Sequence, residues 1–103
     1  MSSVMAVADG LLADGKPIAL LMNNAGTMCT HFQQTPDGLE YTVAVNYVAP
    51  YLLSRKLLPL MQAGSRIVCM VSCTYAIGQI TPEFFTRGKK GDSGVFRYIA
   101  IRN

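Results

Sequence analysis

Three polar side chains stand where apolar segments end or are interrupted, and these residues are the ones best suited to chemistry. Asn23 follows the apolar run 18–22, and Ser72 follows the apolar run 67–71. Asn46 lies between the two runs, on an otherwise apolar helical pattern. Amides and hydroxyls both donate and accept hydrogen bonds. Together, these three side chains would line a crevice that orients a small polar ligand.

The elements around these residues predict a strand–helix–strand unit. Runs 18–22 and 67–71 are apolar at every position, which is typical of central parallel strands covered on both faces. Residues 37–63 show one long helical pattern, so the two strands should pair in parallel, with this helix crossing between them. The fold class is therefore α/β. Ligands bind where the strands of such a sheet end, so Asn23, Asn46 and Ser72 should cluster at one edge.

Local signals predict how the long helix begins and where its course changes. Thr35 fits a helix N-cap, with Pro36 at the first helical position. Pro50 removes a backbone donor inside the run, so we expect a kink or a break there. The helix is apolar nearly all round, which predicts that it is buried or pressed against a partner chain.

A shorter helix should precede the first strand. Residues 3–13 carry apolar side chains near one helical face, and residues 14–17 form a turn that stops the helix. The apolar residues of that face are Val4, Val7, Leu11 and Leu12.

Length and composition restrict the classes of protein to which this chain can belong. Its 103 residues, 1–103, allow one small domain or part of a larger one. With 50% hydrophobic and 15% charged residues, the chain is too apolar to be disordered. The net charge is +3, and the one small basic cluster, at Arg87, Lys89 and Lys90, is better read as a solvated loop. We therefore expect no nucleic-acid partner.

The cysteines, the histidine and the apolar runs point to a cytoplasmic protein without a metal. Three cysteines, Cys29, Cys69 and Cys73, form no even disulfide set, and Cys69 is expected to be buried within its strand. The single His31 has no partner at metal-ligand spacing. The longest apolar run is far shorter than the ~20 residues of a membrane span. Reduced thiols fit the cytoplasm.

Three motifs resemble those of the short-chain dehydrogenases/reductases. Asn23-Asn24-Ala25-Gly26 is similar to the family's NNAG turn. The segment 45–53 is similar to its V-N-x-x-G-x-F-x-L helix, and 66–72 to its R-I-V-x-x-S-S strand. They occur in the family's order and at about its spacings, and the long excursion before Tyr98 is similar to the retinol-dehydrogenase-like branch. The resemblance implies a Rossmann-like, doubly wound parallel sheet, of which this chain holds the βαβ core.

The resemblance also implies an activity. The family transfers a hydride between NAD or NADP and a small-molecule alcohol or carbonyl. If the family's residue roles are transferred to the matching positions of this sequence, Tyr98 is the general acid/base, Ser72 hydrogen-bonds the substrate oxygen and Asn46 supports a proton-relay water. Asn23, with Ala25 and Gly26, would line the cofactor, whereas Asn24 would tie adjacent strands together. Each of these residues also has a plain structural interpretation, such as a turn residue or a strand end.

The chain departs from the family pattern in ways that affect activity. Arg102 stands four residues after Tyr98, where the family has Lys, and its planar guanidinium is not equivalent, so Tyr98 could instead be a core or surface residue. A shift of one residue would put Cys73 in place of Ser72. Nothing matches the Gly-rich turn T-G-x-x-x-G-x-G that receives the cofactor's pyrophosphate.

Two functions are therefore expected. The first is an oxidoreductase by lineage, truncated at both ends of the fold and inactive as the isolated chain. The alternative is a non-catalytic remnant or interaction module that binds a partner through its apolar helix. An oligomer formed through 37–63 is one form that this binding would take.

Overall fold

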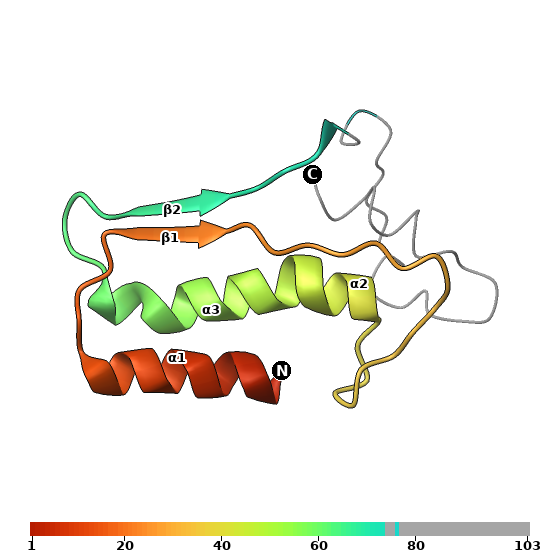
Figure 1. The fold of residues 1–103 in the computed structure, drawn as a ribbon, viewed down its shortest axis with the longest axis horizontal. Helices are drawn as coiled ribbons and strands as arrows, with labels where there is room; N and C mark the ends of the chain where they lie inside the picture. Colours follow the sequence, from red (N-terminus) through yellow and green to blue (C-terminus); the bar gives the residue numbers. More distant parts are fainter. Residues whose placement is uncertain (74–75, 77–103) are drawn as a thin grey trace.

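A computed structural model describes residues 1–73 and 76 (Figure 1). Its elements, in chain order, are α1 (Ser2–Asp14), β1 (Leu20–Asn23), α2 (Tyr41–Val43), the π-helical turn Ala44–Val48, α3 (Ala49–Leu57), the 3-10 turn Leu58–Leu60 and β2 (Arg66–Cys69). The arrangement is α/β and agrees with a partial Rossmann-like fold. Tyr98, Arg102 and the basic cluster lie outside the described residues. Within the described part, no helix is long and apolar enough to cross a membrane.

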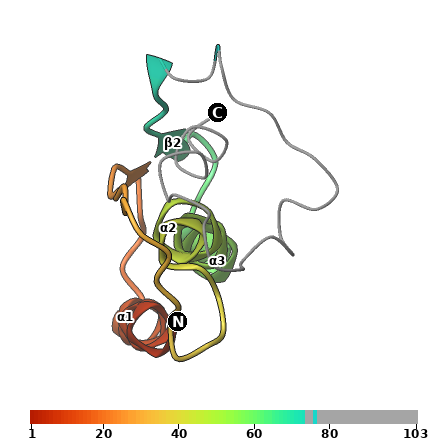
Figure 2. The same ribbon diagram turned by 90° about the vertical axis from the view of Figure 1, so that its right-hand side faces the viewer.

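The two strands pair in parallel, which confirms the predicted topology. Leu20 pairs with Arg66 at one end of the ladder, and Asn23 pairs with Cys69 at the other. Both strands lie within two residues of their predicted positions, and the long helical run crosses between them. Figures 1 and 2 show α1 and α3 on the same side of this two-stranded sheet.

The prediction that both faces of the sheet are covered is wrong for the described residues. Leu20 is 54% exposed and Met22 is 53% exposed, whereas Leu21 and Asn23, which alternate with them, are half-buried. Cys69 is exposed rather than buried, as are its neighbours in β2. The physical reason is that α1 and α3 pack on one side of the sheet, so the described part places no element over the other face.

Helix α1 ends where the sequence predicts. Gly15 adopts the left-handed conformation, with φ of 68°, and its N–H donates to the carbonyl of Leu11. Ala8 is fully buried on the side that packs against α3, and the Lys56 ammonium lies 2.7 Å from the Asp9 carboxylate beside it. Val7 is 58% exposed and Leu11 is 40% exposed, so the predicted apolar face is wrong at these two positions. A small side chain lets the backbones of α1 and α3 come close, and Ala8 therefore lies at the contact between these two helices.

The long helix begins later than predicted, at Tyr41, so Thr35 is not its N-cap. Residues 35–38 close a turn in which the Gly38 N–H donates to the Thr35 carbonyl at 2.9 Å. Gly38 has a φ of 80°, a left-handed conformation that a right-handed helix does not continue. Glu40 caps the helix instead, because its Oε2 accepts a hydrogen bond from the Val43 N–H at 2.9 Å.

Of the kink or break expected at Pro50, a break does not occur, and the regular α-helical pattern changes just before the proline. The helical run continues from Tyr41 to Leu60, and its hydrogen-bond pattern changes in the π-helical turn just before Pro50. The wider turn accommodates the proline without interrupting the helix. Val43, Ala44 and Leu57 from this run are buried and form the core with Ala8.

Candidate functional site

Asn46 clamps the loop that follows β1 against the long helix. Its Oδ1 accepts a hydrogen bond from the Thr27 N–H at 2.8 Å, and its Nδ2 donates to the Thr27 carbonyl at 2.8 Å. The side chain is only 8% exposed, so Asn46 faces inward, as the sequence analysis requires. Two bonds to the backbone of one residue define the position of the loop that carries Ala25 and Gly26.

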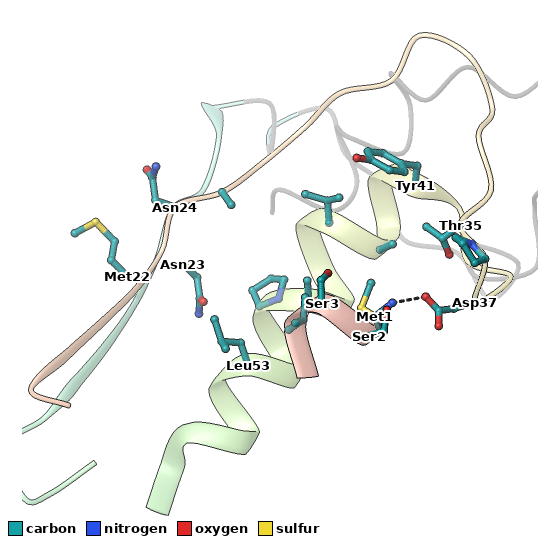
Figure 3. A pocket seen from close by; sticks show the side chains of 17 residues that line it. Met1, Ser2, Ser3, Met22, Asn23, Asn24, Thr35, Asp37, Tyr41 and Leu53 are labelled. Carbon is teal, nitrogen blue, oxygen red and sulfur yellow. Dashed lines mark hydrogen bonds and ion pairs between the residues drawn. The ribbon is translucent and has the colours of Figure 1, made fainter. Parts of the chain in front are cut away.

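Asn23 makes a second connection between the strand ends and the helix. Its Nδ2 donates to the Ser54 Oγ of α3 at 3.0 Å and lies 3.6 Å from the Cys69 Sγ of β2. The sequence analysis expected Asn24 to tie adjacent strands. In the structure Asn23 makes this contact, and Figure 3 shows the Asn24 side chain directed away from the helix. Alternation along β1 explains the difference, because successive side chains point to opposite faces.

Ser54 is a site residue that the sequence analysis missed. It lies in α3, among residues whose pattern indicated only apolar packing. The available signal was a hydroxyl eight positions after Asn46 on a helix that crosses beside the strand ends.

Two cavities lie beside these contacts. The smaller, of about 350 Å³, is lined by Asn23, Ala25, Asn46, Tyr47, Pro50, Tyr51, Ser54, Cys69, Met70 and Val71. The larger, of about 550 Å³, opens between the end of β1, the start of α1 and the turn at 35–37 (Figure 3). Asn23 and Ala25 border both cavities, and Asn24 borders the larger one. Both volumes are in the range of small-molecule sites.

Only some of the predicted site residues line the smaller cavity. Asn23, Ala25 and Asn46 share the smaller cavity. Ser72 is half-buried and directly follows Val71, which lines that cavity, but Ser72 is not itself a lining residue. Gly26 is exposed in the same loop and lines neither cavity.

Glu40 holds the beginning of the helix that carries Asn46. Glu40 is 7% exposed, and its buried Oε1 has no hydrogen-bond partner within the described part of the chain. The Asp37 carboxylate pairs with the terminal ammonium of Met1 at the wall of the larger cavity (Figure 3). In residues 1–73 and 76 there is no group of three metal-ligating side chains.

Comparisons with known proteins agree with the three motifs. A family model described as enoyl-(acyl carrier protein) reductase matches residues 1–102. Human retinol dehydrogenase 12 is 38% identical over 98 residues, which is 93% of this chain and 31% of that protein. Bovine retinol dehydrogenase 12 is 38% identical over 80 residues, 76% of this chain and 25% of that protein. Mouse polyprenol dehydrogenase is 37% identical over 86 residues, 78% of this chain and 26% of that protein.

The chain thus spans between a quarter and a third of the length of these relatives. The range that the family model matches, 1–102, contains the NNAG-like turn, the helix with Asn46 and the strand before Ser72. The chain is an oxidoreductase-family protein that belongs to the short-chain dehydrogenases/reductases, on the side of the retinol dehydrogenases.

Proposed function

We propose that this chain carries part of the active site of an NAD- or NADP-dependent enzyme that interconverts an alcohol and a carbonyl. The observation that carries the proposal is the pair of 2.8 Å hydrogen bonds between Asn46 and Thr27. This clamp holds the loop with Ala25 and Gly26 beside the cavity that Asn46 itself lines.

Each proposed residue has a chemical role that its side chain or backbone can perform. Pro50 has no N–H, so the Asn46 carbonyl lacks its α-helical donor and is suited to hold a relay water. The Ser72 hydroxyl would donate to the oxygen of the substrate as negative charge develops there. Tyr98 would exchange the proton, and Arg102 would supply the positive charge that favours its phenolate.

The described residues fit only the neutral parts of a dinucleotide. The polar groups around both cavities are mainly amides and hydroxyls, and neither lining contains a Lys or Arg side chain. The sequence also lacks the Gly-rich turn that binds pyrophosphate at a helix N-terminus. NAD or NADP would supply or accept the hydride when bound, but residues 1–73 and 76 present no cradle for its phosphates.

A chimera tests the proposal directly. In this chimera, the matched 98-residue segment of human retinol dehydrogenase 12 is replaced by the residues of this chain. The rest of that enzyme is kept and supplies the Gly-rich turn that this chain lacks. We expect the chimera to oxidise retinol. Because general acid–base catalysis contributes about 10²–10⁴-fold, Tyr98→Phe should lower the rate by that order, while Arg102→Lys should raise it.

The unmodified relative is the control for the chimera. In the chimera, Ser72→Ala should also reduce kcat, whereas Cys73→Ala should leave kcat close to that of the unsubstituted chimera. A folded, cofactor-binding chimera whose rate is unaffected by Tyr98→Phe would refute the proposed role of Tyr98.

The second candidate function is an interaction module, and exposed residues of the long helix favour it. Tyr51 is 62% exposed and Leu58 is 44% exposed on α3 and the turn that follows it. Such aromatic and aliphatic groups suit a contact with a second copy of the chain. Sedimentation of the chain should then show a dimer that Tyr51→Lys dissociates, and a monomer at all concentrations would exclude self-association through this helix. A cytoplasmic location, expected from the reduced cysteines, belongs to both proposals and is testable by cell fractionation.

A further inference from the structure

We propose that Pro50 is a positioning residue: by maintaining the π-helical turn at 44–48, it aligns Asn46 with Ser54 along the segment that follows β1. The inference deepens the proposed function and rests on the role given there to Asn46. Its structural content, however, concerns only contacts within the described part of the chain.

The π-helical turn and the proline are physically connected. The Ala49 N–H donates to the carbonyl of Ala44, five residues earlier, instead of to the carbonyl four residues earlier. In a regular α-helix the ring of Pro50 would press against the carbonyl of Asn46, and Pro50 has no N–H to offer in return. A wider turn at this point relieves the contact, so the proline favours the π pattern over the α pattern.

The turn changes the direction in which Asn46 points relative to Ser54. The two residues are eight positions apart, and at about 100° for each residue an ideal α-helix would set them about 80° apart in angle. A π turn absorbs one extra residue, which leaves seven effective steps and reduces this angle toward about 20°.

This alignment matches the partners of the two side chains. Asn46 binds the backbone of Thr27, and Ser54 accepts a hydrogen bond from Asn23. Both partners lie in the short segment 23–27, which runs beside the helix. In a regular α-helix only one of the two side chains would face segment 23–27. The π turn lets both side chains face it, so both hydrogen-bond contacts form.

Amide hydrogen exchange of the full chain, followed by NMR, tests this inference without cofactor or turnover. Pro50→Ala supplies the missing N–H, so the turn should become α-helical and the new amide at position 50 should be protected. The Thr27 amide should then exchange at least about tenfold faster relative to the Ala8 amide, the change expected when one hydrogen bond is lost. Asn46→Ala gives the reference value for complete loss of the clamp.

Two further variants make the test specific. Pro59→Ala removes a proline from the 3-10 turn of the same helical run and should leave the exchange of Thr27 unchanged. Deletion of Val48 together with Pro50→Ala removes the extra residue, so a regular helix again aligns Asn46 with Ser54 and the protection of Thr27 should return.

The inference is overturned if Thr27 stays as protected in Pro50→Ala as in the natural chain, or if Pro59→Ala has the same effect. If Pro50→Ala does not fold, the combined variant decides, because a folded combined variant with an unprotected Thr27 contradicts the alignment. Either failure would leave the oxidoreductase proposal standing, since that proposal is tested by the rate of the chimera.

Discussion

The isolated chain is expected to bind NAD(H) and NADP(H) weakly or not at all, and to turn over no alcohol or carbonyl. Capture of the pyrophosphate by a Gly-rich turn and a helix N-terminus supplies much of the orientation of a dinucleotide, and this chain has no such turn. The linings of the two cavities offer no Lys or Arg in its place. Arg102 in the position of the family's Lys would slow the proton transfer further, because acid–base catalysis is worth about 10²–10⁴-fold.

Calorimetric titration of the purified, monodisperse chain with each cofactor measures this expectation. Monodispersity has to be verified first, because Leu20 and Met22 expose apolar surface on the face of the sheet that no described element covers. A dissociation constant in the low micromolar range, with turnover that disappears in Ser72→Ala and Tyr98→Phe, would show that the chain is a working enzyme. The chimera with human retinol dehydrogenase 12 is the positive control, because there the missing turn is present.

Replacement of Leu57 by alanine is expected to remove most of the stability of the chain. Leu57 is 1% exposed and is the largest apolar side chain that the described residues bury completely. A buried Leu→Ala change costs about 2–5 kcal/mol, because it loses transfer free energy and leaves a cavity. A small domain has a free energy of unfolding on the order of 5 kcal/mol, so little would remain.

The adjacent residue provides a matched control. Leu58 follows Leu57 directly and is 44% exposed, so Leu58→Ala should lower the free energy of unfolding by less than about 1 kcal/mol. Urea titration followed by far-ultraviolet circular dichroism measures both variants at one protein concentration. If both variants lost the same free energy of unfolding, the burial of the Leu57 side chain in the core would be contradicted.

The sequence by itself determined the topology and the inward direction of Asn46. Two runs without a polar residue, joined by one long helical segment, favour pairing as parallel strands with a crossover, and the structure has this topology. Helix α1 ends at Gly15 as expected, because glycine has no Cβ and adopts the left-handed conformation that ends a helix without steric cost. A lone amide on an apolar helix face must find partners when it is buried, and Asn46 finds both in Thr27.

Only the tertiary structure decided which of several suitable residues makes each contact. Thr35 and Glu40 can both cap a helix, and the closed turn at 35–38 leaves the role to Glu40. Asn23 and Asn24 have the same side chain, and the alternation of β1 directs Asn23 toward Ser54.

The response of the helix to Pro50 was likewise beyond local reasoning. A proline inside a helical pattern is compatible with a kink, a break or a widened turn. The choice depends on where Asn46 and Ser54 have to point, and those directions are set by residues 23–27, which are distant in the sequence. Local patterns determine which elements form, because backbone preferences act over a few residues, whereas the partner of each polar side chain depends on neighbours that only the folded chain brings together.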